Sequence, residues 1–304
     1  MIEIPFDPNI FDSGSFTLSW HGFMSFIAVG GAVYLVGRWA KKEGIDPDVV
    51  YNVAVFGIIG GILGARIVHV ADNWDFYSAN PGNIFQVWAG GIGLWGGILG
   101  GWLGGMGYAV VNNRITSDPR MKVPIGRLMD LTAPAILIAQ AVGRVGDLIN
   151  GEHWSKATDL PWGWTFTNFN SPGFQGPPAS RTDIAWDPTQ ATHPTAAYEL
   201  IGDLLLFLVV WKLRGRFVPD GALWMVYLTL YSTMRFAIQF LRVDEVKVWG
   251  LQEAHFIAII VVAVTVPWMV MFLRWKRGSS DDDTPDEPAT HTGSTRRRRR
   301  RATA

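Results

Sequence analysis

The stretch AQAVGRVGDLINGEHWS, residues 139–155, begins as the end of an apolar helix and finishes as a polar turn with several glycines. Arg144 and Asp147 are three positions apart, so they share one face of a helix. Gly146 and Gly151 carry no side chain, which lets another group approach the backbone closely. An arginine with carboxylate, amide and imidazole neighbours at the end of a membrane helix predicts a site for an anionic headgroup.

A purely structural role for this stretch is the alternative. An arginine near a helix end often extends its charge to the membrane interface, and Arg144 by itself fits that role as well as a binding role. Several polar residues follow it closely, and ionisable residues inside a membrane usually mark functional sites. The neighbours that favour a functional site are Asp147, Asn150, Glu152 and His153.

The composition predicts an integral membrane protein without disulfides. The chain is 49% hydrophobic, and several apolar runs reach the roughly 20 residues that a helix needs to cross a bilayer. The sequence holds no cysteine, so any thiol that takes part in a reaction belongs to a substrate. Glu3, Asp7 and Asp12 precede the first apolar run where a signal peptide would carry basic residues, which predicts a retained membrane helix.

The apolar runs predict an all-α fold, a polytopic membrane helix bundle of about seven transmembrane helices. The longest polar stretch, residues 150–193, is rich in proline and tryptophan, which predicts a small outward-facing domain on the membrane interface. We call this stretch the head region, and we expect residues 1–277 to form one membrane domain that includes it. The predicted helices span residues 16–38, 49–71, 90–111, 125–149, 194–213, 221–241 and 252–274.

Residues 278–304 are of low complexity and predict a disordered tail, whose Arg296–Arg301 run could rest on anionic lipid headgroups or simply be solvated. The orientation of the bundle follows from the basic residues of short loops, which stay on the cytoplasmic side. Most loop lysines and arginines follow the first, third, fifth and seventh predicted helices. The N-terminus and the head region are therefore predicted outside, and the C-terminal tail in the cytoplasm.

Ionisable residues recur near the predicted outer ends of several helices. Arg235, Gln239 and Arg242 lie at spacings of four and three, on one face of the sixth predicted helix. Tyr198 and Glu199 lie near the start of the fifth. Further ionisable residues on the same side are His21, Arg66, His69, His193 and Asp203.

Arginines from three predicted helices are therefore expected to meet near the outer leaflet. An arginine at mid-helix costs about 2.5–3.5 kcal/mol to insert, so their collection at one level predicts a function. The guanidinium fork suits bidentate phosphate binding, and the excess of arginine over acid predicts a phospholipid headgroup as the ligand. A single ion pair with Glu199 or Glu152 could instead be purely structural. The four arginines are Arg66, Arg144, Arg235 and Arg242.

The third predicted helix is rich in glycine. Gly96, Gly97 and Gly100 belong to a series that predicts close packing against a neighbouring helix. The turn before this helix, residues 90–93, could additionally admit a lipid beside Gly91.

The motif GRVGDLINGE, residues 143–152, resembles the signature of the bacterial prolipoprotein diacylglyceryl transferases. Weaker motifs appear in the order of that family: WAGG at 88–91 with glycines at 96 and 97, HPTAAYE at 193–199, and arginines at 235 and 242. The likeness spans about residues 16–275. Seven predicted helices with an outside N-terminus also fit this family.

The resemblance implies a reaction at the bacterial cytoplasmic (inner) membrane. The family moves the sn-1,2-diacylglyceryl group of phosphatidylglycerol onto the lipobox cysteine of a preprolipoprotein signal peptide. A thioether forms, glycerol phosphate leaves, and the thiolate of the substrate is the nucleophile. No cofactor, metal or nucleic-acid partner is implied.

Position within the motifs implies the roles of individual residues. Arg144 would bind the lipid phosphate, and Arg235 would assist departure of the leaving group, on which charge grows. Asp147 beside Arg144 could take a proton. The remaining lipid-binding residues are expected to be Asn150, Glu152, Arg242, Gly91, Tyr198 and Glu199.

Several positions depart from the family pattern and leave the general base open. Trp95 stands where the family often carries a histidine proposed as the base. His153 or His21 could substitute, although either could be only a polar lining residue. Asp147 stands in place of the signature asparagine, and Gln239 in place of a glutamate on the sixth helix.

Two other functions stay open on the sequence. These departures allow a homologue that binds lipid with little or no transferase activity. A membrane transporter with an anion site is the other alternative, although no repeated half of the kind that inverted-repeat carriers have is visible.

Overall fold

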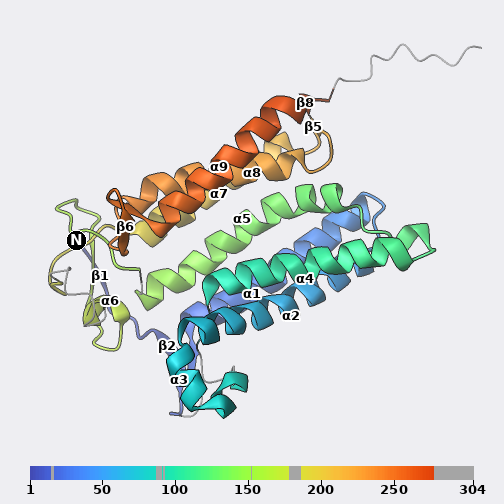
Figure 1. Cartoon of the computed structure of the whole chain (residues 1–304). Helices are drawn as coiled ribbons and strands as arrows, with labels where there is room; N and C mark the ends of the chain where they lie inside the picture. The colour runs from blue at the N-terminus through green and yellow to red at the C-terminus, as the bar shows by residue number, and fades with distance from the viewer. Residues whose placement is uncertain (15–16, 87–90, 92, 152, 178–185, 277–304) are drawn as a thin grey trace, which may run out of the picture.

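The computed structural model describes residues 1–14, 17–86, 91, 93–151, 153–177 and 186–276. Long helices run side by side along most of this part of the chain (Figure 1). Each begins and ends within a few residues of its predicted range. They are α1 (Trp20–Lys42), α2 (Pro47–Asp72), α4 (Leu94–Ile115), α5 (Ile125–Asn150), α7 (Thr195–Leu213), α8 (Ala222–Gln239) and α9 (Glu253–Phe272).

Short elements connect and flank these helices. α3 (Trp74–Ala79) and the 3-10 helix η1 (Pro81–Phe85) lie between α2 and α4, η3 (Pro119–Met121) lies between α4 and α5, and α6 (Pro172–Gln175) lies in the head region. The strands pair two by two. The pairs are β1 (Ile2–Ile4) with β4 (Trp164–Phe166), β2 (Asn9–Asp12) with β3 (Thr17–Ser19), β5 (Phe217–Val218) with β8 (Arg274–Trp275), and β6 (Val246–Val248) with β7 (Leu251–Gln252).

Glycine lets α2 and α4 pack closely. A Cβ atom added at Gly60 would meet the backbone carbonyl of Gly100, and one added at Gly64 would meet that of Gly96. The two backbones therefore lie too close for a side chain between them at these positions. The predicted packing role of the glycines at 96 and 100 is confirmed.

α5 is the central helix of the bundle. It packs against α1, α7 and α8, while α4 packs on α2 and α9 packs on α8 (Figure 1). Gly151 ends α5 with φ +73°, in the left-handed conformation that glycine adopts without strain. This turn leads the chain from the end of α5 into the head region.

Much of the helix surface is suited to lipid. Within the described residues, four helices are long and apolar enough to cross a membrane: α1, α2, α5 with the residues just before it, and α9. Only 17% of the most apolar stretch of α2 is buried inside the protein. Ile58, Ile59 and Ile62 on this helix are each about half exposed. Apolar side chains exposed on this scale match contact with acyl chains. The chain is a multi-pass membrane protein.

Charged groups fasten one end of the bundle. Glu43, which follows α1, accepts from Arg127 Nε at 2.5 Å and from Arg214 Nη2 at 2.8 Å. Asp130 accepts from two backbone N–H groups at the start of α8, at 2.9 and 3.0 Å. These contacts join α1, α5, α7 and α8, and they satisfy backbone groups that a helix start leaves without partners.

The head region lies at the other end of the bundle. β1 pairs in parallel with β4, with Ile2 opposite Trp164, so the N-terminus packs on the head region. A bridge between Ser155 and Arg242 joins the head region to the residues after α8. The head region is therefore fastened beside the ends of α5 and α8 and the start of α7.

Candidate functional site

Arg144 lies near the end of α5 and faces two carboxylates. Its Nη1 donates to Asp147 Oδ2 at 2.6 Å, from the same face of the helix, and its Nη2 is ion-paired with Glu199 Oε2. Only 17% of the Arg144 side chain is exposed. A guanidinium held by two carboxylates has a fixed orientation, which a site for a planar or tetrahedral anion requires.

Glu199, near the start of α7, gathers three arginines. Its side chain is 1% exposed. Oε1 accepts from Arg235 Nη1 at 2.6 Å and lies 3.5 Å from Arg242 Nη1, while Oε2 pairs with Arg144. We call Arg144, Arg235 and Arg242 the arginine cluster. The structure brings these three together, as the sequence predicts, although they come from α5, α8 and the turn after α8.

Arg66 has a different place. It donates to the backbone carbonyls of Ile84 at 2.8 Å, Gly91 at 2.9 Å and Asn83 at 2.5 Å, and it lies over the ring of Tyr77. Its fork therefore holds the loop between α2 and α4. The described contacts of Arg66 are therefore with this loop, and the described ion pairs bring together three of the four arginines that the sequence predicts to meet.

Asp147 joins two histidines to the arginine cluster. Its Oδ1 lies 2.6 Å from His21 Nδ1, and its Oδ2 lies 3.0 Å from His153 Nε2. Arg242 Nη2 lies 3.0 Å from His153 Nδ1, and a guanidinium can only donate, so Nδ1 accepts. Nε2 of His153 then carries the proton and donates to Asp147. In this tautomer the 3.1 Å approach of Arg144 Nη1 to the same nitrogen is a contact and not a hydrogen bond.

The two histidines differ in access. The side chain of His153 is 22% exposed, whereas that of His21, which meets Asp147 through Nδ1, is 42% exposed. A carboxylate on Nδ1 holds the ring in one tautomer and stabilises the imidazolium that forms on proton uptake. His21 and Asp147 therefore have the arrangement of a general base and its orienting carboxylate. His153 is arranged as a fixed lining residue.

Acids balance the charge of the arginine cluster. Asp147 and Glu199 face the arginines directly, and Asp244 Oδ2 accepts from Arg242 Nε at 3.2 Å. Asp203, one turn beyond Glu199 on α7, is also buried. The predicted excess of arginine over acid is therefore wrong for the part of the chain that the structure describes. Paired charges cost less to hold away from water than a surplus of one sign.

Asp244 lies in the loop after α8, and the sequence did not single it out. Burial would raise the pKa of its carboxyl, but the charge of Arg242 and a hydrogen bond from Gln239 hold the pKa below its ordinary value. The stability that this carboxylate contributes is therefore present at neutral pH and is lost as the pH falls into the acid range. In the sequence, its position two residues after Arg242 was the signal that could have identified it as part of the site.

Gln239 supports this corner of the site. Its amide is fully buried and donates to Asp244 Oδ2 at 2.6 Å and to Gln252 Oε1. Gln252 in turn donates to the backbone carbonyl of Arg242 at 3.0 Å. The amide of Gln239 therefore helps to position Arg242. Gln239 stands at the position where the family carries a glutamate.

Two other predicted lipid-binding residues, Tyr198 and Asn150, contact side chains of the head region. The hydroxyl of Tyr198 accepts from a tryptophan of the head region at 2.9 Å, which ties α7 to that region. Asn150 is buried, and its backbone carbonyl accepts from Ser171 Oγ at 3.0 Å. Glu152 lies outside the described residues.

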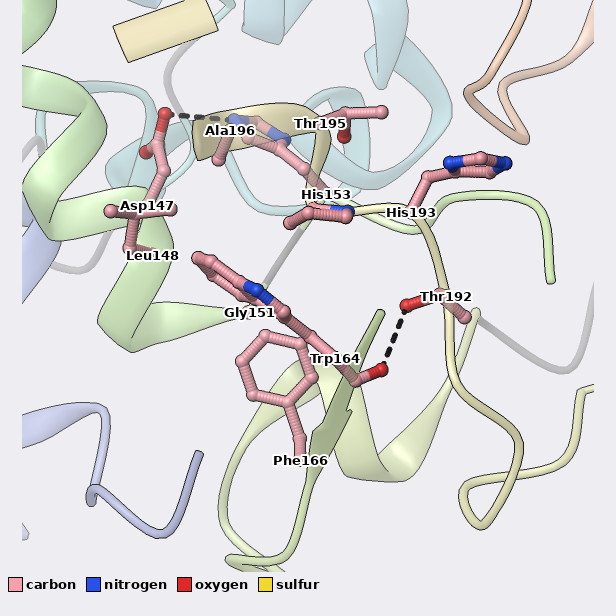
Figure 2. A pocket seen from close by; sticks show the side chains of 11 residues that line it. Asp147, Leu148, Gly151, His153, Trp164, Phe166, Thr192, His193, Thr195 and Ala196 are labelled. Atoms are coloured by element: carbon pink, nitrogen blue, oxygen red, sulfur yellow. Dashed lines mark hydrogen bonds and ion pairs between the residues drawn. The ribbon is translucent and has the colours of Figure 1, made fainter. Parts of the chain in front are cut away.

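A small cavity adjoins Asp147 and His153 on the side of the head region (Figure 2). Its volume is about 20 Å³, which is room for about one water molecule. Trp164 and Phe166 of β4 line it together with the residues that lead into α7. The cavity is therefore a small, mostly apolar space beside Asp147 and His153.

These features define a class: a multi-pass membrane protein with a buried, charge-balanced arginine cluster and a histidine–aspartate pair at one end of its bundle. The sequence profile of the prolipoprotein diacylglyceryl transferases matches residues 8–271, and the chain belongs to this family. A phosphatidylglycerol–prolipoprotein diacylglyceryl transferase of Synechococcus elongatus is 31% identical over 280 residues, covering 90% of each chain. One of Dehalococcoides mccartyi is 33% identical over 276 residues, covering 90% of this chain and 96% of the relative. The resemblance seen in the motifs is confirmed.

Proposed function

We propose that this protein transfers the diacylglyceryl group of phosphatidylglycerol to the lipobox cysteine of preprolipoproteins. Family membership and the names of the relatives support this reaction. The sulfur of the substrate cysteine attacks the glyceryl carbon next to the phosphate and forms a thioether. The carbon–oxygen bond to the phosphate breaks, glycerol phosphate leaves with the bonding electrons, and the thiol proton passes to a base on the enzyme.

The convergence of three guanidiniums on Glu199 carries the assignment of the phosphate site. The carboxylate of Glu199 lies where oxygens of a phosphodiester could meet the same three side chains. Because Glu199 already pairs with them, a ground-state phosphodiester gains little by binding there. The negative charge that grows on the departing phosphate gains more, and stabilisation confined to the transition state is what lowers a barrier.

His21 is the base in this scheme. Its Nδ1 meets Asp147, which orients the ring. Its side chain is also more exposed than that of His153. Trp95, at the position of the histidine that the family often carries, is an indole and cannot accept a proton from a thiol. Asp147 is therefore assigned to orient His21, and Arg144 and Arg235 to bind the phosphate.

A lipidation assay tests the function. Purified protein is incubated with phosphatidylglycerol vesicles and a lipobox peptide, and the mass of the peptide is measured by mass spectrometry. A peptide heavier by one diacylglyceryl group supports the transferase, and a peptide with serine in place of the lipobox cysteine is the control. Unmodified peptide with thermal protection by phosphatidylglycerol would indicate a lipid-binding homologue. Anion flux across the vesicles without product would indicate a transporter.

Arg235→Lys is expected to lower kcat by at least about tenfold while the protein still folds. Lysine keeps the positive charge for Glu199 but replaces the planar fork with a point charge, which fits a phosphate group less well. Turnover of the lipobox peptide measures the effect. Arg216→Lys, on an exposed arginine between α7 and α8, is the matched control. Full activity of Arg235→Lys would reduce Arg235 to a structural partner of Glu199.

The proposed topology has all seven long helices crossing the membrane. The N-terminus and the head region lie outside in this topology, and residues 278–304, which lie beyond the described residues, form a cytoplasmic tail. The unequal distribution of basic residues among the loops supports it. The bacterial inner membrane follows from the family.

Single cysteines test the topology, since the sequence has none of its own. Phe169 in the head region is 71% exposed, and Ile115 at the end of α4 is 74% exposed. A membrane-impermeant maleimide is expected to label Phe169→Cys in intact spheroplasts, and Ile115→Cys only after the membrane is broken. The reverse order of labelling would mean that the protein has the opposite orientation in the membrane.

A further inference from the structure

A second cavity lies far from the arginine cluster, between α2, α4, α5 and the start of α8. Its volume is about 270 Å³. A rise of about 1.5 Å per residue puts Met129, in its wall, roughly 22 Å along α5 from Arg144. The cavity is therefore separate from the site described above. Residues from all four helices line it, among them Val53, Gly57, Gly105, Leu128, Met129 and Trp224.

The lining suits a hydrocarbon chain. Thr132 brings a hydroxyl to the wall, but this hydroxyl donates to the backbone carbonyl of Leu128 at 2.8 Å. The other lining side chains are apolar or aromatic. Trp102, which is 54% exposed, lines the cavity and also reaches the outer surface of the bundle. A ligand in this place is therefore apolar and can enter from the surrounding lipid.

Close helix packing does not account for all the glycines in the wall. At Gly57, Gly101 and Gly105 an added Cβ would lie no nearer than 3.4 Å to any neighbouring atom, which is an ordinary contact. At Gly60 and Gly100 it would collide with the partner backbone. The first three positions all line the cavity. A methyl group would therefore fit at these three positions, and the packing of α2 on α4 does not by itself require glycine there.

Two exposed cations are sequence neighbours of residues at one end of the cavity. Asn113, in the last turn of α4, donates to the backbone carbonyl of Val123 at 2.9 Å and accepts from its N–H at 2.6 Å. Val123 is part of the cavity wall. Arg114 and Lys122 adjoin these two residues in the sequence, so this double contact brings their backbones near the cavity wall, and both side chains are exposed. A basic edge next to an apolar cavity is complementary to an anionic lipid, whose charge and acyl chains are joined in one molecule.

We infer that this cavity binds an acyl chain of an anionic phospholipid from the leaflet at this end of the bundle, with the phosphate of the headgroup on Arg114 and Lys122. On the proposed topology this is the cytoplasmic leaflet. The bound lipid is distinct from the lipid consumed at the arginine cluster, so its binding does not depend on the proposed reaction.

Photocrosslinking in vesicles tests the site. The full-length protein is reconstituted with phosphatidylglycerol or with phosphatidylcholine that carries a diazirine on one acyl chain, and crosslinked peptides are identified by mass spectrometry. Crosslinks to residues 101–109 and 123–132 are expected, with a yield about tenfold higher for phosphatidylglycerol because the headgroup meets two cations. Equal yields for the two lipids would overturn the headgroup assignment.

Two sets of variants sharpen the test. Ala109→Leu extends a lining side chain into the cavity and is expected to abolish most of the crosslinking. Gly107→Leu is its matched control on the same helix, since a Cβ at Gly107 meets no atom within 4 Å. Arg114→Gln with Lys122→Gln, both on exposed side chains, is expected to fold normally and to reduce the phosphatidylglycerol yield to that of phosphatidylcholine.

A further variant separates this site from the reaction site. Arg144→Ala is expected to leave these crosslinks unchanged, because the two sites lie far apart along α5. Undiminished crosslinking in a folded Ala109→Leu protein, or an unchanged lipid preference in the double variant, would overturn the inference.

Discussion

Replacing Arg144 with alanine is expected to lower kcat/KM for diacylglyceryl transfer by about 10²–10³-fold. This is the usual effect of removing one hydrogen-bond donor that stabilises the negative charge of a transition state. Its guanidinium lies between Asp147 and Glu199 and so points to the place assigned to the phosphate. Without it the departing phosphate loses a charged donor where negative charge grows. The initial rate of mass gain of a lipobox peptide in phosphatidylglycerol vesicles measures the change.

The same substitution leaves buried carboxylates short of a partner, which can destabilise a protein by about 3–5 kcal/mol. Combining Arg144→Ala with Glu199→Gln removes one charge of each sign and separates the two effects. We expect the double variant to recover thermal stability but not activity. If activity returned with stability, Arg144 would serve only to neutralise Glu199. Wild-type rates in the single variant would lead to the same conclusion.

His21→Gln is expected to lower kcat by about 10²–10⁴-fold, the range that general-base catalysis supplies. Glutamine keeps a side chain that can donate to Asp147, but it takes no proton from a thiol. The measurement is kcat between about pH 5 and 8, the range in which histidine changes charge. The wild-type rate should fall toward low pH as the base becomes protonated, and the variant should lack this acid limb.

His153→Gln is the matched control, because His153 also meets Asp147 but its side chain is less exposed than that of His21. We expect this variant to keep the acid limb of the pH profile and to change KM more than kcat. Loss of the acid limb in His153→Gln, with its retention in His21→Gln, would exchange the roles of the two histidines.

Glu199 also explains how the arginine cluster stays folded in a membrane without its lipid. Three guanidiniums without acids would be costly to hold at this depth. Three carboxylates balance this positive charge through direct contacts: Asp147, Glu199 and Asp244. A lipid phosphate must then compete with Glu199 for the same donors, which favours release of glycerol phosphate after the transfer. Selectivity for the transition state follows from the same competition.

The sequence predicted the long helices well for a physical reason. A run of apolar residues long enough to cross a bilayer can only be a helix when no partner strand satisfies its backbone. The helix ends followed from local signals, such as Gly151 after α5. The close approach of α2 and α4 followed from glycines that recur on one helix face, as at Gly96 and Gly100.

The candidate site was predicted only in part. The motif at 143–152 and the spacing of Arg235 and Arg242 were recognisable because each is a local pattern, and their predicted position on the same side of the membrane led to the expectation that they meet. Arg66 was grouped with them on depth alone, and depth does not tell whether a fork meets a ligand or a loop carbonyl. Asp244 was missed because it follows a helix end, where the direction of the chain is not set by periodicity.

By itself, the sequence determined the positions of the long helices, the membrane class, the family and the absence of a thiol in the enzyme. Only the tertiary structure decided which charges meet: Glu199 with arginines from α5 and the end of α8, and Asp147 with histidines from α1 and the head region. Spacing along one helix fixes which side chains share a face. Which faces adjoin depends on how all the helices pack and rotate against one another, and no single segment carries that information.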